Sequence, residues 1–183
     1  PEWVGRGEVS HIWDKPAATV LEINSKSGLY PLLAAYNLYE RRLAQQKQSE
    51  DKVHRKLWND VLSNNIYVLC KSPMAKTITE RTLAGYTKTK MNIVYVEDLI
   101  EKLRQDSKYK GYNVHKELQE KFGTGAKEVK FTAVVGNPPY QVTTDTNFAT
   151  PVYHLFFEAS KSLSPDYVSL IHPARFLFNA GAT

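Results

Sequence analysis

Short apolar runs alternate with helical patterns along the chain, and this alternation restricts the possible folds more than any other feature of the sequence. The runs are rich in β-branched and aromatic residues, as buried strands are. Strands that alternate with helices predict an α/β fold with a doubly wound, mostly parallel sheet. Ligands of such sheets bind beyond the carboxyl ends of the strands. The predicted strands are Thr19–Ile23, Ile66–Cys70, Asn92–Val96, Phe131–Val135 and Tyr167–Ile171.

The segments between these strands carry helix and loop signals. Apolar spacing and first-turn prolines predict two long helices, one from Pro31 to about Gln46 and one from Pro73 to about Leu83. Ser72 is the expected N-cap of the second helix. Shorter patterns predict helices at Trp58–Leu62, Leu99–Leu103, Tyr112–Phe122 and Pro151–Leu163, a polar linker at Gln45–Lys56 and a mobile polar loop at Gln141–Thr150.

The fourth predicted strand runs into Gly136-Asn137-Pro138-Pro139-Tyr140, which predicts a stiff loop. The two prolines fix φ and remove two backbone donors, and Asn137 is pushed to extended geometry because a proline follows it. The Asn137 carboxamide and the Pro138 carbonyl can accept both hydrogens of an exocyclic amine, which favours a nucleophilic nitrogen. Tyr140 can stack on the ring that carries this amine. The alternative is a proline-rich turn that only closes a core strand.

A second candidate loop, Asn24–Gly28, follows the first predicted strand. Its residues are mostly small or polar and a helix follows it, so a ligand can approach both the backbone and the positive end of the helix dipole. By itself this pattern is a weak indication of a nucleotide site. Because this loop and Asn137–Tyr140 both follow predicted parallel strands, both are expected at one edge of the sheet.

Composition limits the remaining possibilities. The chain of 183 residues is long enough for one domain, and its formal net charge of +5 is compatible with a polyanionic partner, although the basic residues are spread along it. The single cysteine excludes an internal disulfide, and the five histidines lack metal-ligand spacing, so no metal site is expected. Without a long apolar run or a signal-peptide pattern, we expect a cytoplasmic protein with no membrane partner.

The Asn-Pro-Pro-Tyr motif at 137–140 resembles the catalytic motif of amino-methyltransferases that use S-adenosylmethionine. From Thr19 onward the chain looks most like the N6-adenine DNA methyltransferases of restriction–modification systems. The resemblance implies a Rossmann-like methyltransferase fold, S-adenosylmethionine as cofactor, and double-stranded DNA with an adenine-containing recognition site as partner. It implies that the adenine is flipped out of the duplex. The catalytic residues Asn137, Pro138, Pro139 and Tyr140 then hold its amine in line with the methyl group.

The same resemblance implies the cofactor site. Glu22 corresponds to an acidic residue near the methionine part of the cofactor, and Asp98 to an acidic group that meets the adenine amino group. The loop that wraps the methionine part consists of Asn24, Ser25, Lys26, Ser27 and Gly28.

Two positions depart from the family pattern. Lys26 stands where a glycine is usual, so its side chain either crowds the site or meets a carboxylate. Cys70 stands where an acidic residue usually holds the ribose hydroxyls, and a thiol is a poor acceptor for two hydroxyls. Ser72 can take over this contact, and Cys70 itself can be a buried strand residue.

We expect the chain to be a piece of a longer polypeptide, because it begins at Pro1 rather than Met and ends at Thr183 just after an apolar stretch. Residues 1–18 are expected to form a leading segment, and residues 19–183 a partial catalytic domain. The family's first cofactor-binding segment and its target-recognition domain are expected outside these residues, together with restriction nuclease or helicase parts.

Two other functions fit the same residues. One is a methyltransferase that acts on RNA or on a protein amide, since protein-glutamine methyltransferases share the motif. The long Gln45–Lys56 insertion favours restriction enzymes instead. The other is a catalytically degenerate piece that binds DNA or serves as a scaffold in a restriction complex. Lys26 and Cys70 favour this alternative, and the intact Asn137–Tyr140 motif opposes it.

Overall fold

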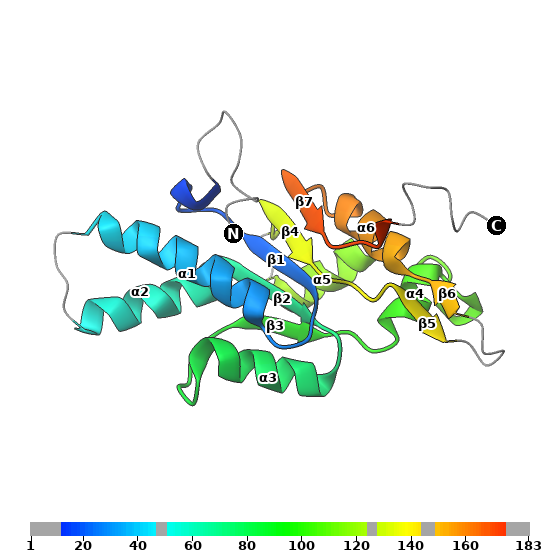
Figure 1. The fold of residues 1–183 in the computed structure, drawn as a ribbon, viewed down its shortest axis with the longest axis horizontal. Coiled ribbons are helices and arrows are strands. Elements are labelled where there is room, and N and C mark those ends of the chain that lie inside the picture. Colours follow the sequence, from blue (N-terminus) through cyan, green and yellow to red (C-terminus); the bar gives the residue numbers. More distant parts are fainter. Residues whose placement is uncertain (1–11, 47–50, 124–127, 144–148, 175–183) are drawn as a thin grey trace.

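The central sheet of the computed structural model is parallel throughout, which confirms the predicted α/β fold. The structure describes residues 12–46, 51–123, 128–143 and 149–174 (Figure 1). The order of the strands reverses between β1 and β4, and doubly wound sheets bind their ligands at this kind of switch point. Within the described residues the strands, in sheet order, are β3 (Asn92–Tyr95), β2 (Ile66–Cys70), β1 (Val20–Ser25), β4 (Ala133–Gly136) and β7 (Tyr167–Leu170). All five lie within two residues of their predicted boundaries.

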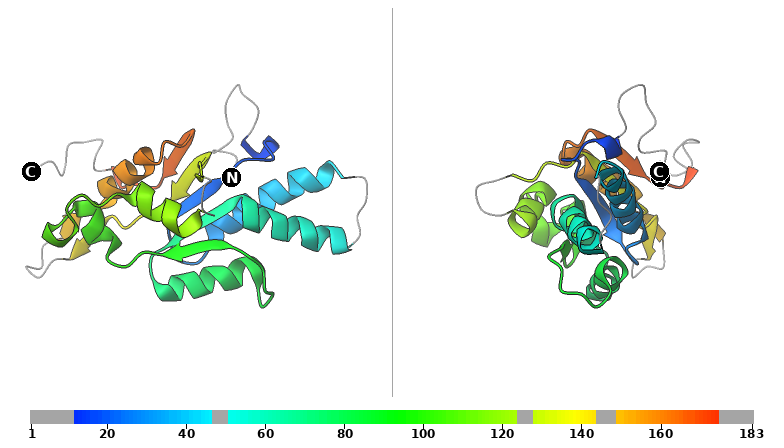
Figure 2. Two further views of the ribbon diagram at one scale, coloured as in Figure 1. Left: turned by 180° about the vertical axis from the view of Figure 1, so that it is seen from behind. Right: turned by 90° about the vertical axis from the view of Figure 1, so that its left-hand side faces the viewer.

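Helices cover both faces of the sheet (Figure 2). Successive strand residues point to opposite faces, so the two layers have separate cores. All of β1 is buried, as expected of a strand covered on both sides. No helix among the described residues is long and apolar enough to span a membrane. One face carries α1 (Leu29–Ala44), α2 (Asp51–Asn64) and α3 (Pro73–Ala84), and the other carries α4 (Leu99–Arg104), α5 (Val114–Phe122) and α6 (Tyr153–Ser162), with the short helix η3 (Ser107–Tyr109) between α4 and α5.

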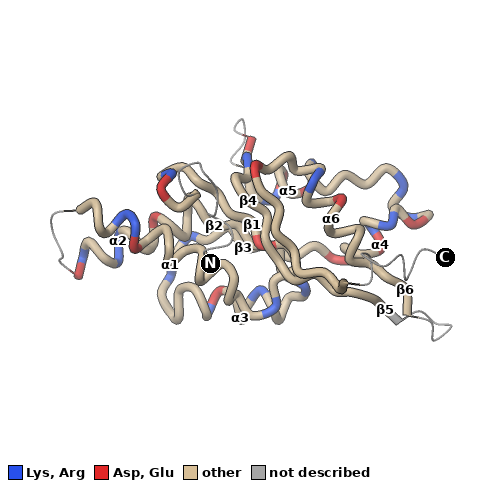
Figure 3. The backbone as a smooth tube through the Cα atoms, turned by 45° about the horizontal axis from the view of Figure 1, so that its top comes forward, with Lys and Arg blue, Asp and Glu red and all other residues tan. Residues whose placement is uncertain are grey.

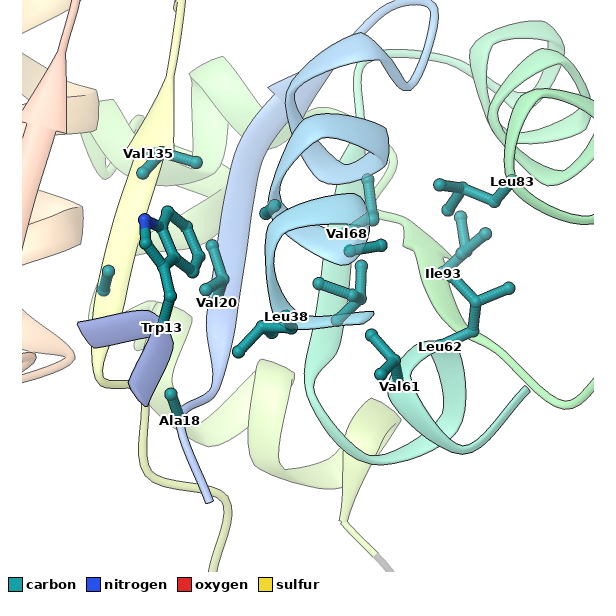
Figure 4. Packing of buried hydrophobic residues seen from close by; sticks show 14 of the residues in the cluster. Trp13, Ala18, Val20, Leu38, Val61, Leu62, Val68, Leu83, Ile93 and Val135 are labelled. Atoms are coloured by element: carbon teal, nitrogen blue, oxygen red, sulfur yellow. The ribbon is translucent and has the colours of Figure 1, made fainter. Parts of the chain in front are cut away.

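Part of the leading segment belongs to the core, although the sequence predicted the domain to begin only at residue 19. Here η2 (Ile12–Asp14) is a short 3-10 helix in which Ile12 and Trp13 are buried. Figure 4 shows the Trp13 ring beside Val20 and Val135 on the α1–α3 face of the sheet. The residues just before β1 therefore stabilise the fold. Residues 1–11 of the segment lie outside the described residues.

The predicted caps of α3 are confirmed. The Ser72 hydroxyl oxygen accepts a hydrogen bond of 3.1 Å from the backbone N–H of Ala75, and Pro73 occupies the first turn. Gly85, with a positive φ of 58°, ends the helix. These local signals place the start of α3 directly at the carboxyl end of β2.

The predicted linker Gln45–Lys56 is partly wrong, because α2 already begins at Asp51. Its first turns are polar on the exposed side, and only Leu57, Val61 and Leu62 are buried against the sheet. The predicted helix Trp58–Leu62 is therefore the second half of a longer one. Residues 47–50 lie outside the described residues.

The predicted mobile loop Gln141–Thr150 is also partly wrong. It contains the antiparallel strands β5 (Gln141–Thr143) and β6 (Ala149–Pro151), which pair with one another. The paired residues include β-branched side chains, which favour strands. Since Pro151 belongs to β6, α6 begins at Tyr153 rather than at the proline. Residues 144–148 lie outside the described residues.

Candidate functional site

Every segment that carries a predicted site residue leaves the same edge of the sheet. The strands β3, β2, β1 and β4 are parallel neighbours, so the segments after their carboxyl ends lie side by side (Figure 1). Along this edge Asp98 follows β3, Ser72 follows β2, Asn24–Gly28 continues from β1, and Asn137–Tyr140 follows β4. Neighbouring strands are about 4.8 Å apart, so the four segments span roughly 14 Å.

Asn24 connects the two loops at the switch point. Its φ of 68° lies in the left-handed region, which asparagine tolerates better than most residues. The β1–β2 pairing shifts register between Ile23 and Ser25 as a result. The buried Asn24 side-chain amide donates a hydrogen bond of 3.5 Å to the Asn137 carbonyl. The predicted cofactor loop and the Asn-Pro-Pro-Tyr motif are therefore in direct contact.

Gly136 lets β4 approach β1 closely at the base of the motif. A Cβ atom at this position would lie 2.5 Å from the Ile23 carbonyl oxygen, which is closer than real Cβ contacts. On the other side the Gly136 carbonyl accepts a hydrogen bond of 3.0 Å from the Ile171 N–H. Beyond this fixed base Asn137 is half-buried and Tyr140 is 41% exposed. The motif thus combines a rigid base with an accessible aromatic tip.

The β5–β6 hairpin extends directly from this tip. The backbone N–H of Val152, just after β6, donates a hydrogen bond of 3.0 Å to the Tyr140 carbonyl, and the Val152 side chain is fully buried. The hairpin is therefore anchored at its base to the start of α6, beside the motif.

Glu22 is a buried carboxylate on β1, directly before the loop. It is 4% exposed, and its Oε2 atom has no hydrogen-bond partner. Burial raises the pKa of the Glu22 carboxyl to about 7, although the Ser25 hydroxyl and the charge of Lys26 oppose this rise. The unsatisfied oxygen of this buried carboxylate can still accept a hydrogen bond or pair with a cation.

Helix α3 supports the predicted cofactor loop from behind. The Ser25 hydroxyl lies 3.3 Å from that of the buried Thr79 and accepts a hydrogen bond of 3.2 Å from the Gly28 N–H. Gly28 has a φ of 77°, and a Cβ atom there would lie 3.0 Å from the Thr79 side chain. One turn further along, the Thr82 hydroxyl donates to the Ser27 carbonyl over 2.7 Å. The loop conformation thus depends on α3 as well as on β1.

The two departures from the family pattern differ in their surroundings. Lys26 is exposed, so its side chain does not fill the loop. Cys70 is 1% exposed, its thiol donates to Thr79 over 3.8 Å, and burial raises its pKa to about 11. The prediction of Cys70 as a buried strand residue is confirmed. Ser72 lies at the edge itself, where its oxygen caps α3.

Asp98 begins α4 without capping it. Its φ of 53° is left-handed and its side chain makes no helix-cap bond. Instead its Oδ2 atom accepts a hydrogen bond of 2.5 Å from the Tyr109 hydroxyl and lies 3.7 Å from the Lys108 ammonium. The segment between α4 and α5 therefore orients this carboxylate at the far end of the edge.

Tyr30, which was not predicted as a site residue, belongs to the same group. It lies in the first turn of α1, and partial burial together with the charges of Glu22 and Tyr140 raises its pKa. Tyr30 thus interacts electrostatically with the buried carboxylate of Glu22 and with Tyr140 of the motif. The sequence indicated a role for Tyr30 in the site only through its position shortly after Gly28.

His172 is a second residue that the sequence did not indicate. It follows β7 at the same edge, with its ring centroid 5.3 Å from that of Tyr153 and 5.9 Å from that of Phe157. Burial lowers its pKa. The pairing of β7 with β4 and the hydrogen bond from Val152 to Tyr140 bring these aromatic rings to the side of the motif.

Comparisons with known proteins bear on the family of the chain. An uncharacterised adenine-specific methylase of Mycoplasma pneumoniae is 32% identical over 68 residues, which cover 35% of this chain and 16% of that relative. The chain thus corresponds to a small part of that protein's length. The model of the Eco57I restriction-modification methylase family matches residues 64–183, which are 120 of the 183 residues and include the motif. The chain therefore belongs to the Eco57I restriction-modification methylase family.

Proposed function

We propose that the intact protein is a site-specific adenine-N6 DNA methyltransferase of a restriction–modification system. Its cofactor is S-adenosylmethionine, which supplies a methyl group on a sulfonium that is already a good leaving group. One observation carries the proposal: the buried Glu22 carboxylate on β1 and the Asn137–Tyr140 motif after β4 lie on neighbouring strands at the switch point, where Asn24 bonds to the motif. Membership of the methylase family supports the reaction class.

The order of the segments along the sheet edge suits this cofactor. In the proposed site Asp98 after β3 binds the adenine, Ser72 after β2 the ribose, and Glu22 with its loop the methionine part, which is the order of these segments along the edge. The motif after β4 comes next, where the methyl acceptor must lie. An elongated nucleoside joined to an amino acid fits an edge of roughly 14 Å.

The amino acid part of the cofactor is a zwitterion, and the start of α1 offers a partner for each charge. The first N–H groups of a helix lack intrahelical partners and favour a negative group. Gly28, the N-cap of α1, contributes no side-chain cap bond, so these groups suit a carboxylate. The unsatisfied oxygen of Glu22 suits the ammonium. A cation beside Glu22 favours its charged form and lowers its pKa.

The motif supplies positioning rather than covalent chemistry. The Asn137 amide oxygen and the Pro138 carbonyl accept the two hydrogens of the adenine amine, which draws the nitrogen lone pair out of conjugation and points it at the methyl group. The exposed Tyr140 ring stacks on the flipped base, a contact worth about 1–3 kcal/mol. Holding two groups in line in this way accounts for most of the rate gain that such a site needs.

The test is methyl transfer from labelled S-adenosylmethionine to DNA by the full-length protein, followed by nucleoside mass spectrometry. Asn137→Ala and Tyr140→Ala are expected to abolish N6-methyladenine while leaving the thermal unfolding temperature nearly unchanged. The matched controls are Asn64→Ala, at an exposed position, and Tyr167→Ala. Tyr167 is 41% exposed, like Tyr140, but begins β7 at the opposite edge of the sheet.

The outcomes separate the competing functions. Unchanged DNA methylation in both motif variants would overturn the proposed site. Motif-dependent transfer to RNA or to a protein glutamine amide, with none to DNA, would replace the substrate and keep the site. DNA binding without transfer to any of these acceptors would identify a degenerate methyltransferase-fold piece instead.

A further inference from the structure

The excess positive charge of the chain is concentrated in one region, although the basic residues themselves are spread along the sequence. Residues 51–91 contain eight Lys or Arg and three Asp or Glu, a net charge of +5, which equals the formal net charge of all 183 residues. This region comprises α2, β2, α3 and the turn into β3. Figure 3 shows Lys and Arg recurring along α2 and α3.

The turn between α3 and β3 forms a basic hollow. Its volume is about 550 Å³, and its lining includes Arg81, Lys88 and Lys90 together with the hydroxyl-bearing Thr87 and Thr89. The single carboxylate in the lining, Glu80, lies 4.0 Å from the ammonium of Lys76 one turn earlier in α3. Positive charges therefore predominate in this hollow.

An exposed aromatic ring stands beside the hollow. Tyr86 is 89% exposed, and the Arg81 guanidinium lies 4.3 Å from its ring centroid. Arg81 also donates a hydrogen bond of 3.2 Å to the Gly85 carbonyl, which holds the guanidinium in the turn. One face of the ring is thus covered by a cation while most of the ring remains accessible. An aromatic ring among cations is the combination that stacks on bases or sugars next to phosphates.

The hollow continues onto α2. The Thr89 hydroxyl donates to the Asn59 side chain over 3.1 Å, and Ser63 donates to the Lys90 carbonyl over 2.8 Å. Asn59 also lines a second hollow of about 450 Å³ on the outer side of α2, together with Asp51, Lys52, Arg55 and Lys56. The two hollows therefore form one surface, which we call the α2–α3 basic surface.

This surface is separate from the proposed methyl-transfer site. α3 starts at the carboxyl edge of the sheet and ends at the turn that carries Lys88 and Lys90. A helix of 12 residues spans about 18 Å, so the turn lies at the opposite, amino edge. Figure 1 shows α2 and this turn at the end of the molecule opposite the β5–β6 hairpin.

We propose that the α2–α3 basic surface binds the sugar–phosphate backbone of a nucleic acid. The cations of this surface are distributed along two hollows. This distribution matches a row of phosphates and not a single small anion. The lysine and arginine side chains of the surface suit phosphate oxygens, and the exposed Tyr86 ring suits a sugar or base, a combination that an acidic protein surface does not offer. The surface adds affinity without reading sequence, because backbone contacts carry no base information.

The test is equilibrium binding of the full-length protein to a labelled DNA duplex of about 30 base pairs, by fluorescence anisotropy between about 50 and 200 mM salt. Lys88→Ala/Lys90→Ala is expected to weaken binding roughly tenfold and to reduce the slope of log K against log salt by about 1–2. Lys110→Ala/Lys116→Ala is the matched control, because both lysines are exposed and lie around the start of α5. This pair is expected to change the slope by much less.

A second pair of variants tests the aromatic contact without changing the charge. Tyr86→Ala is expected to weaken binding to a single strand about tenfold, and Tyr86→Phe to restore it. Neither binding assay depends on methyl transfer, so both remain informative in the Asn137→Ala background. Equal losses in the two lysine pairs, or competition by polyglutamate as effective as by unlabelled DNA of equal charge, would overturn the proposal.

Discussion

Replacing the buried carboxyl of Glu22 with an amide tests the energetics of the site. The pKa of this carboxyl is raised from 4.5 to about 7, so between these pH values the folded protein holds a proton that the unfolded chain has released. The free energy of unfolding therefore falls as the pH rises through this window. With 1.36 kcal/mol for each pH unit, the loss is about 3 kcal/mol by pH 8. Since Glu22 is only 4% exposed, solvent screening reduces this value little.

Glu22→Gln keeps the size of the side chain and removes the titration. The variant is expected to lose the part of the pH dependence that Glu22 contributes, so its stability difference between pH 5 and pH 8 should shrink by about 2.5 kcal/mol. The measurement is urea unfolding of both proteins at each pH. Comparing differences cancels any constant cost of burying the amide, because that cost is the same at both pH values.

A matched substitution separates burial from a general effect of charge. Glu120 on α5 is exposed, and Glu120→Gln is expected to leave the stability difference between pH 5 and pH 8 close to that of the wild type. If Glu22→Gln retains the full pH dependence, the carboxyl is not the buried titrating group, and the reasoning about its unsatisfied oxygen fails with it.

Three further changes test the packing around the same edge. Gly136→Ala places a Cβ atom 2.5 Å from a backbone oxygen of Ile23 and should lower the free energy of unfolding by about 1–3 kcal/mol, measured with urea. Asn24→Ala should destabilise the protein by about 1–2 kcal/mol because φ is 68°, whereas Asn24→Gly should cost less in the same assay. Thr79→Val should weaken S-adenosylmethionine binding in calorimetry by about 1–2 kcal/mol and Thr79→Ser should restore it, because the hydroxyl holds the loop. Equal effects of the two substitutes at either position would contradict these assignments.

Most of the fold was predictable because its signals are local. Each central strand is an apolar run with turn residues at its ends, and Ser72, Pro73 and Gly85 mark α3 in the sequence itself. The start of α2 was missed because its first turns are mostly polar and give no clear apolar spacing in the sequence. The few apolar contacts of α2 are recognised only when the helix is seen packed against the sheet. The β5–β6 hairpin was missed because strands of three residues give almost no periodic signal.

The site was predictable as far as a motif or a strand end marks it. Glu22 lies within a recognisable strand, Asn24–Gly28 and Asn137–Tyr140 each follow a predicted one, and a parallel sheet brings the ends of these strands to one edge. Tyr30 and Thr79 were not predictable as site residues, because each acts through groups from elsewhere in the sequence. Such contacts depend on how α1 and α3 pack against the rest of the structure. The spacing of residues within one segment does not predict that packing.

The buried carboxylate of Glu22 explains why position 70 carries a thiol instead of the acidic residue that is usual in the family. Both residues are buried on adjacent strands, and the charge of Glu22 contributes to raising the pKa of the thiol, so the two groups interact. An acidic residue at position 70, buried as Cys70 is, would place a second carboxylate in the interior where burial already penalises the first. A neutral thiol bonded to Thr79 avoids that repulsion and still supports the loop. Recognition of the cofactor ribose is then expected to fall on Ser72, which lies one step further out at the accessible edge.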